Sequence, residues 1–104
     1  MDIEKYQSLC KDDTIAITQH ANRRFQERNI SLNDIESAIS NGKIIEEYPD
    51  DTPLPSCLIL GLSENNFPLH VVVSADDEYL YVITAYYPNF QKWEDDFETR
   101  RKCD

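Results

Sequence analysis

The stretch Thr18–Arg28, TQHANRRFQER, is the segment around which the rest of the chain is organised. As a helix, it places His20, Arg24 and Arg28 four residues apart, which is slightly more than one turn. These three side chains therefore form one cationic stripe along the helix. Phe25 lies beside the stripe and can face a core. The pattern predicts a helix that packs on one side and presents an imidazole and two guanidinium groups on another.

The cationic stripe has two interpretations. Two arginines one turn apart repel each other unless an anion or a carboxylate lies between them, which favours an anion-binding face. Most charged helix faces, however, are only solvated. Glu27 and acids elsewhere in the chain would then neutralise the arginines in a surface network. The residues alone leave both interpretations open.

Length and composition predict a single soluble domain. The 104 residues can form one modest core, and 40% hydrophobic with 29% charged residues is ordinary for a globular protein. No apolar run approaches the roughly 18 residues that a membrane helix needs. The amino terminus, MDIEKY, lacks the order of a secretory signal. We expect one domain over residues 1–104, with a core of about 15–101, in the cytoplasm and without a membrane partner.

The charge balance argues against an ordinary nucleic-acid binder. Ten Lys and Arg against twenty Asp and Glu give a net charge of −10, whereas nucleic-acid binders are usually basic. The signs are segregated, because Arg23, Arg24 and Arg28 cluster in the central helix and Arg100 and Arg101 at the carboxyl end. Local fields decide binding more than the total charge does, so RNA remains a candidate partner.

Cysteine and glycine usage excludes several kinds of site. Cys10, Cys57 and Cys103 are odd in number and far apart, which supports neither a disulfide framework nor a zinc site. Cys57 is expected to pack as a small apolar residue. Gly42 and Gly61 are the only glycines, which excludes a phosphate-cradling glycine loop. No metal or cofactor is expected.

Hydrophobic spacing and turn residues predict an α+β fold. Thr18 and Ser31 are expected N-caps of two packed helices, the second with a capping box to Asp34, and Asn29 suits the left-handed turn between them. From Lys43 the period becomes that of an antiparallel meander. The predicted elements are a short helix at 2–11, a brief strand at 15–17, helices at 18–28 and 31–41, strands at 43–47, 56–62, 69–74 and 79–86, and a helix or extended arm at 89–101.

The same spacing predicts which side chains pack. Three apolar residues of the 31–41 helix recur at three- and four-residue steps, so they should face Phe25 and the sheet. They are Leu32, Ile35 and Ile39. Near the carboxyl end, Trp93 and Phe97 recur at helical spacing. We expect them to cover the body of the domain and to bring Arg100 and Arg101 back toward it.

Two predicted strands carry polar residues that could meet. Because alternate residues of a strand share a face, His70 lies on the same side as Val72 and Ser74, and Thr84 on the same side as Tyr86. If both faces are the same side of the sheet, His70, Thr84 and Tyr86 converge. The alternative is a partly buried histidine and tyrosine, each with one satisfied hydrogen bond.

Five segments together carry a resemblance to a known family. They are ITQHANRRFQERNIS (17–31), AISNGKIIEEYP (38–49), PLHVVV (68–73), ITAYYP (83–88) and KWEDDF (92–97). The chain resembles small bacterial and archaeal proteins catalogued as a domain of unknown function, which are similar to BrnT and RelE ribonuclease toxins. The resemblance covers about residues 15–101. It implies two helices packed on a four- to five-stranded curved antiparallel sheet, and an antitoxin partner, commonly one with a small zinc finger.

The residues suit the chemistry that this resemblance implies. Metal-free RNA cleavage needs a base for the ribose hydroxyl, a cation for the phosphate and an acid for the leaving oxygen. His20 or His70 could serve as base or acid, since imidazole titrates near neutrality. Arg24 and Arg28 could each hold the phosphate through paired hydrogen bonds. Of these two, Arg24 is predicted to be catalytic and Arg28 to bind the substrate. Tyr86 could donate a hydrogen bond or a proton. The remaining expected substrate-binding residues are Thr84, Arg100 and Arg101.

A different class of function is also open. The chain could be a non-catalytic interaction module whose acidic surface binds a basic partner protein. Geometry separates the two hypotheses: if His20 and His70 lie apart, or the cationic stripe faces inward, the catalytic hypothesis loses its basis.

Overall fold

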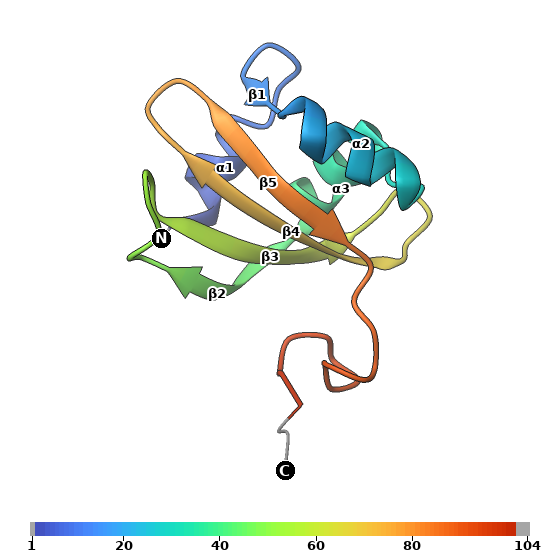
Figure 1. The fold of residues 1–104 in the computed structure, drawn as a ribbon. Coiled ribbons are helices and arrows are strands. Elements are labelled where there is room, and N and C mark those ends of the chain that lie inside the picture. The colour runs from blue at the N-terminus through green and yellow to red at the C-terminus, as the bar shows by residue number, and fades with distance from the viewer. Residues whose placement is uncertain (1, 102–104) are drawn as a thin grey trace.

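Three helices and five strands form the computed structural model, which describes residues 2–101 (Figure 1). In chain order they are α1 (Ile3–Ser8), β1 (Ile15–Ala16), α2 (Gln19–Glu27), α3 (Leu32–Asn41), β2 (Lys43–Tyr48), β3 (Ser56–Leu62), β4 (Pro68–Ala75) and β5 (Leu80–Tyr86). This confirms the predicted α+β class. Residues 88–101, which we call the arm, continue from β5 without a helix. Cys103 lies outside the described residues.

The sheet has the strand order β1-β5-β4-β3-β2. Strands β2 to β5 form the predicted antiparallel meander. The edge strand β1 pairs parallel to β5, so the sheet is mixed and the expectation of a purely antiparallel sheet was wrong. A two-residue strand carries too little pattern to show its direction. The long connection from β1 to β5 through α2, α3 and the meander allows the parallel pairing.

The helix ends are built as the sequence predicts. Thr18 Oγ1 accepts a hydrogen bond from the Ala21 N–H at 3.1 Å. Ser31 and Asp34 form a reciprocal capping box, with two hydrogen bonds of 3.0 Å. Asn29 has φ 56°, the left-handed conformation that turns the chain from α2 into α3. These local features determine where the two helices begin and where the chain turns between them.

The core lies between the helices and one face of the sheet. Ile35 and Ile39 of α3 are fully buried there, as predicted. Gly61 of β3 permits the backbone of α3 to lie close to the sheet, because a Cβ at this position would lie 1.9 Å from the Ala38 carbonyl oxygen. The prediction for Leu32 was wrong, since its side chain is 42% exposed. Helical side chains lean toward the helix N-terminus, so that of the first helical residue projects beyond the packed surface.

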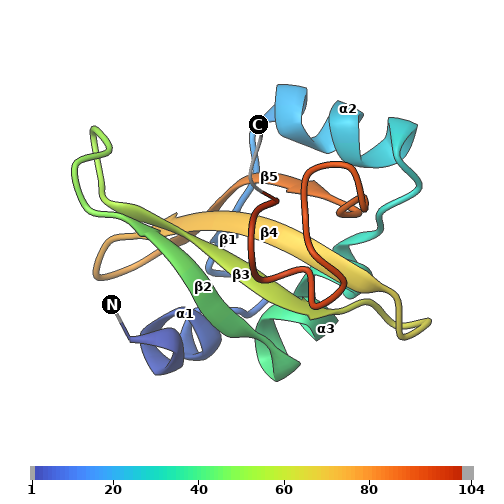
Figure 2. The same cartoon turned by 90° about the horizontal axis from the view of Figure 1, so that it is seen from below.

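The arm covers part of the opposite face of the sheet. Figure 2 shows it crossing in front of the central strands, on the side away from α1 and α3. Trp93 is 2% exposed, which confirms that this segment packs back on the domain. Pro88 is the first residue of the arm, and an isolated bridge between Trp93 and Arg100 closes the arm on itself. The helix alternative for residues 89–101 was wrong.

Removing side-chain volume from α3 tests the core assignment. Ile35→Ala should lower the free energy of unfolding by about 2–5 kcal/mol, because the side chain is fully buried and its loss leaves a cavity. Leu32→Ala on the same helix is the matched control and should change it by less than about 0.5 kcal/mol. Chemical denaturation followed by circular dichroism measures both, and equal losses for the two variants would contradict the assignment.

Candidate functional site

The polar strand residues meet on the face that the arm covers. Cross-strand pairing places His70 opposite Tyr86 and Val72 opposite Thr84. The His70 and Tyr86 rings are 5.3 Å apart between centroids. This row of residues lies on the side of the sheet away from the hydrophobic core.

His70 is fully buried, and both ring nitrogens have partners. Nε2 lies 2.7 Å from the Phe97 carbonyl oxygen, which can only accept, so Nε2 carries the proton. Nδ1 is then the acceptor and faces the Tyr86 hydroxyl at 3.3 Å. Burial lowers the pKa of His70 below its usual value, against the opposing effects of the Phe97 carbonyl and the Glu46 carboxylate. The ring is therefore a neutral base directed at a phenol.

One aromatic side chain and two ion pairs to β2, Arg100–Glu46 and Glu98–Lys43, fix the arm over His70. The Trp93 ring meets the His70 ring edge to face, with centroids 4.4 Å apart. The Arg100 guanidinium lies 4.6 Å from the centre of the Trp93 ring and donates two hydrogen bonds, of 2.8 and 3.0 Å, to Glu46 of β2. Glu46 also accepts from the Tyr48 hydroxyl at 2.5 Å. Arg100 is the main cause of the lowered pKa of Glu46.

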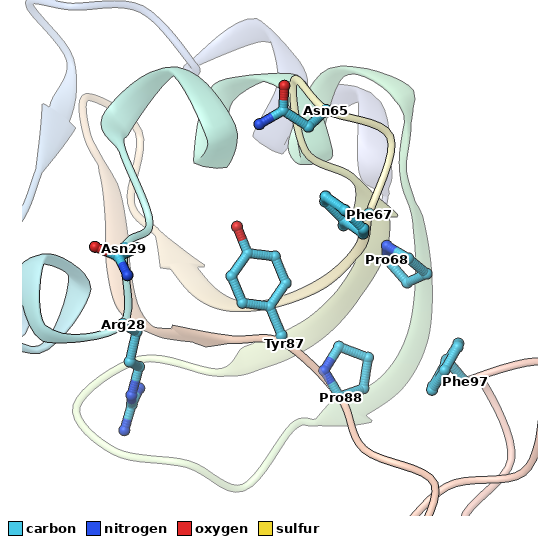
Figure 3. A pocket seen from close by; sticks show the side chains of 8 residues that line it. All are labelled: Arg28, Asn29, Asn65, Phe67, Pro68, Tyr87, Pro88 and Phe97. Atoms are coloured by element: carbon cyan, nitrogen blue, oxygen red, sulfur yellow. The ribbon is translucent and has the colours of Figure 1, made fainter.

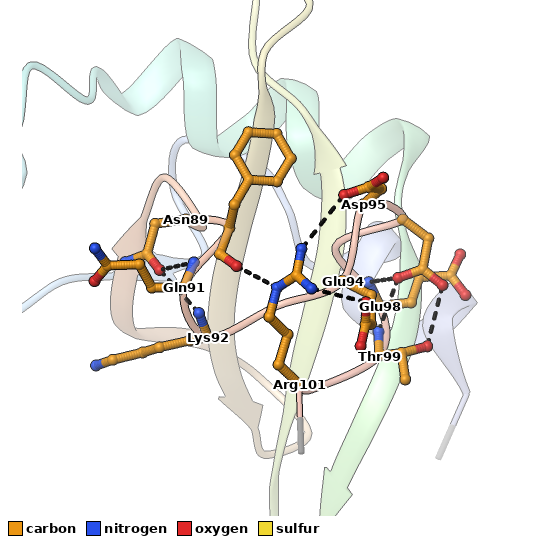
Figure 4. Close-up of polar contacts among 10 residues, drawn as sticks. Asn89, Gln91, Lys92, Glu94, Asp95, Glu98, Thr99 and Arg101 are labelled. Atoms are coloured by element: carbon orange, nitrogen blue, oxygen red, sulfur yellow. Dashed lines mark hydrogen bonds and ion pairs between the residues drawn. The ribbon is translucent and has the colours of Figure 1, made fainter. Parts of the chain in front are cut away.

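The arm keeps its shape through its own hydrogen bonds (Figure 4). Asn89 Oδ1 accepts from the Gln91 and Lys92 backbone N–H groups, both at 3.1 Å. Arg101 donates to the Phe90 carbonyl oxygen and forms ion pairs with Glu94 and Asp95 of the same segment. Arg101 therefore closes the arm, and its predicted role in substrate binding has no support from its position.

A cavity of about 410 Å³ opens between the end of α2, the end of β5 and the arm. Its lining residues are Arg28, Tyr86, Tyr87, Pro88, Asn89, Lys92, Trp93 and Arg100. Three of these carry positive charge, and none of the described lining residues is acidic. We call it the cationic cavity, and it is a local exception on a chain of net charge −10.

The three cations of the cationic cavity differ in how many of their hydrogen-bond donors already have partners. Arg28 Nη1 donates to the Ala85 carbonyl oxygen at 2.8 Å and lies 3.4 Å from Thr84 Oγ1, which fixes the guanidinium at the end of β5. Arg100 is partly neutralised by Glu46. The Lys92 ammonium forms no hydrogen bond or ion pair with any residue between 2 and 101. Arg28 and Lys92 thus have donors available for an anion.

Five predicted site residues do not line this cavity: His20, Arg24, His70, Thr84 and Arg101. His20 and Arg24 are exposed on α2 and do not line it. A helix rises 1.5 Å per residue, so Arg24 and His20 lie about 6 and 12 Å along the axis from Arg28. The structure does not bring His20 and His70 together, because only the end of the stripe reaches the sheet. The catalytic hypothesis therefore loses the pair of imidazoles on which the sequence based it, and any catalytic site must use other residues than this pair. His70, in contrast, is enclosed beneath the arm.

Sequence reasoning missed several residues of this site. Lys92, Asn89 and Tyr87 line the cationic cavity, and Glu46 holds Arg100. The available signal was the adjacency of Lys92 to Trp93, since a cation next to a buried anchor must lie close to the body of the domain. No sequence pattern indicates which acid pairs with Arg100.

One comparison with known proteins identifies the domain. A family model described as "Domain of unknown function (DUF4258)" matches residues 17–87. The chain belongs to the DUF4258 family. The matched DUF4258 span contains α2, α3 and strands β2 to β5, and it ends where the arm begins. Comparisons with curated proteins and with solved structures gave no match. The similarity to BrnT and RelE toxins stays a prediction.

Residues 2–101 lack a metal-binding cluster and a membrane-spanning helix. This part of the chain contains no group of three or more His, Cys, Asp or Glu side chains that could hold a metal ion. It also contains no helix long and apolar enough to cross a membrane.

The buried imidazole predicts how stability depends on pH. The pKa of His70 is lower in the folded chain than in the unfolded chain, so the unfolded state binds more protons below about pH 6.5. Above that pH His70 binds little proton in either state, so it does not change the free energy of unfolding. As the pH decreases from 6.5, the unfolded state gains protons first, and the free energy of unfolding should fall. Glu46, Arg100 and Tyr86 are the ionisable groups near the ring, and the lowered pKa of Glu46 adds a loss only below its usual range near pH 4.5.

Urea unfolding at pH 7.5, 6.5 and 5.5 measures this dependence. His20 is exposed, so His20→Gln is the matched control and should retain the wild-type fall. His70→Gln, which can still donate to the Phe97 carbonyl, should remove it. A wild-type stability that is constant from pH 7.5 to 5.5 would contradict the assignment of a buried neutral His70.

Proposed function

We propose that the protein is a toxin-like, metal-independent endoribonuclease that acts at the cationic cavity. One observation carries the proposal. Tyr86 lines a cavity that also contains Arg28, Lys92 and Arg100, and its hydroxyl faces the unprotonated Nδ1 of the neutral His70. A phosphate held by the cations would therefore lie beside a phenol that has a base behind it.

These residues can carry out the two proton transfers of RNA cleavage. The ribose 2′-oxygen attacks the adjacent phosphorus, a new P–O bond closes a cyclic phosphate, and the bond to the 5′-oxygen breaks. The 2′-hydroxyl gives its proton to the Tyr86 oxygen while the Tyr86 proton passes to His70 Nδ1. The Lys92 ammonium gives a proton to the departing 5′-oxygen. The Glu46 carboxylate, whose charge favours protonation of His70, stabilises the imidazolium.

The cations supply the electrostatic part of the mechanism. Guanidinium groups donate several parallel hydrogen bonds to phosphate oxygens, and Arg28 retains unpaired N–H groups for this purpose. Charge that develops on the phosphate in the transition state is stabilised by cations already in place. Because few cations surround the site, affinity for RNA should be modest and its salt dependence shallow. His20 and Arg24 have no part in the chemical step.

The predicted similarity to BrnT and RelE toxins supports the same proposal and adds a partner. Toxins of that kind are encoded with an antitoxin, and the predicted one carries a small zinc finger. We propose that this partner binds over the cationic cavity and blocks access to Tyr86. Coexpression of a neighbouring antitoxin gene should then relieve the growth inhibition that the active protein causes.

Two substitutions test the proposed chemistry. Tyr86→Phe removes the hydroxyl that relays the proton and should lower the cleavage rate by about 10²–10⁴. Arg28→Ala should reduce it as well, through loss of a phosphate contact. Arg23→Ala, an exposed arginine on the same helix that does not line the cavity, is the matched control and should retain full activity. The assay is cleavage of end-labelled RNA in the presence of a metal chelator.

The outcomes separate the hypotheses. Wild-type rates for Tyr86→Phe would place the chemistry elsewhere on the protein. A wild-type chain that cleaves no RNA in this assay, and inhibits no growth when its partner is absent, would favour the non-catalytic interaction module.

A further inference from the structure

A second cavity, of about 510 Å³, adjoins the cationic cavity (Figure 3). Its lining residues are Arg28, Asn29, Asn65, Phe67, Pro68, Tyr87, Pro88 and Phe97. It shares Arg28, Tyr87 and Pro88 with the cationic cavity. We call it the aromatic cavity, since three of its lining side chains carry aromatic rings.

The aromatic cavity presents large apolar rings to solvent. Phe67 is 58% exposed and Tyr87 is 39% exposed. Their rings meet edge to face, with centroids 6.5 Å apart and planes at 84°, so they form a corner. A flat ligand can stack on the face of one ring while the other forms a wall. Exposed rings arranged in a hollow are typical of a binding surface.

Polar groups stand around this corner without partners in the described chain. The side-chain amides of Asn29 and Asn65 form no hydrogen bond with any residue between 2 and 101. Each amide can donate and accept at once. A flat ligand with both donors and acceptors along its edge matches these amides better than a purely apolar one. A nucleobase is such a ligand.

We infer that the protein takes single-stranded RNA, with one unpaired base in the aromatic cavity and the adjoining phosphate in the cationic cavity. This rests on the proposed function for the identity of the polymer. Arg28, common to both cavities, lies where the base and the phosphate of one nucleotide would join. A base inside a duplex is stacked on its neighbours, so it cannot lie on Phe67 or Tyr87.

The distribution of charge indicates the path of the RNA strand beyond the two cavities. On one side the arm presents Asp95, Asp96 and Glu98, which line a third cavity together with Lys43. Lys43 pairs with Glu98 and Arg101 with Asp95, but carboxylates outnumber cations in this lining, so it is a poor site for phosphate. On the other side the exposed Arg24 and His20 continue from Arg28 along α2. The strand therefore runs over α2, and Arg24 contacts a neighbouring phosphate. The cationic stripe is thereby assigned to binding successive phosphates of the RNA backbone, which is common in proteins that bind single strands.

Binding of an uncleavable probe tests the base site separately from catalysis. The probe is a short fluorescent RNA with 2′-O-methyl riboses, which has no 2′-hydroxyl to attack the phosphorus. Wild-type protein should bind it as a single strand and should bind the same sequence weakly when it is paired with its complement. A probe that is abasic along its length should also bind weakly. Stacking of one base corresponds to a change in Kd of about 5- to 150-fold.

Substitutions identify the surface. Phe67→Ala and Tyr87→Ala should each raise the Kd of the intact probe within that range and leave the Kd of the abasic probe unchanged. Tyr79→Ala is the matched control, because Tyr79 is 42% exposed and does not line either cavity. Arg24→Ala should weaken both probes equally and reduce the slope of log K against log salt by about one. Thermal unfolding confirms that each variant is folded.

Two results would overturn the inference: equal affinity for the intact and abasic probes, or wild-type affinity in both Phe67→Ala and Tyr87→Ala. Binding of the probe with these losses, but without cleavage of unmodified RNA, would overturn the proposed function alone. Cleavage of unmodified RNA that is unaffected by either aromatic substitution would overturn the base site alone.

Discussion

The packing of Trp93 against His70 is the contact on which the whole candidate site depends. His70 lies in the middle of the sheet and would face solvent without the arm over it. The Trp93 ring and the Phe97 carbonyl exclude water from this imidazole, fix its tautomer and direct Nδ1 toward Tyr86. The ion pair between Arg100 and Glu46 holds the arm in this position. The same contacts place one wall of the cationic cavity, so the proposed proton acceptor and the proposed phosphate site both depend on the packing of the arm.

The elements of the fold were predictable because short-range rules determine them. Caps at Thr18 and Ser31 and the left-handed Asn29 are visible in the sequence, and the 56–62 strand matches the observed β3 without change. The parallel pairing of β1 was not predictable, since two residues contain no directional pattern. The prediction that Leu32 is packed was wrong for a related reason. Periodicity assigns a residue to a helix face but does not show where the packed surface ends.

The candidate site was predicted only in part. Most of the residues that the sequence predicted belong to helices and strands or adjoin them, whereas most of the residues that it missed lie in the arm or act through contacts between distant parts of the chain. Tyr86 of β5 and Arg28, the residue that ends α2, line the cationic cavity as the strand and helix periods suggest. Lys92 and Asn89 belong to an irregular segment whose position depends on a few anchors rather than on a repeating pattern. Such anchors act across more than fifty residues, as Arg100 does with Glu46. The stripe of α2 was therefore given too large a chemical role, because it was the only cationic pattern with a period.

The proposed RNA substrate is compatible with the net charge of −10, because the two sides of the arm differ in charge. Lys92 and Arg100 face the cationic cavity, whereas Asp95 and Asp96 line the cavity on the other side of the arm, near Lys43 of β2. Under the proposed function, a polyanion would be attracted at the side of Lys92 and Arg100 and would be disfavoured at the side of Asp95 and Asp96. The acids then contribute to register rather than opposing binding outright, since a misplaced strand would meet like charge. If the proposed function holds, total charge limits the number of phosphates bound, and local charge decides which phosphate reaches Tyr86.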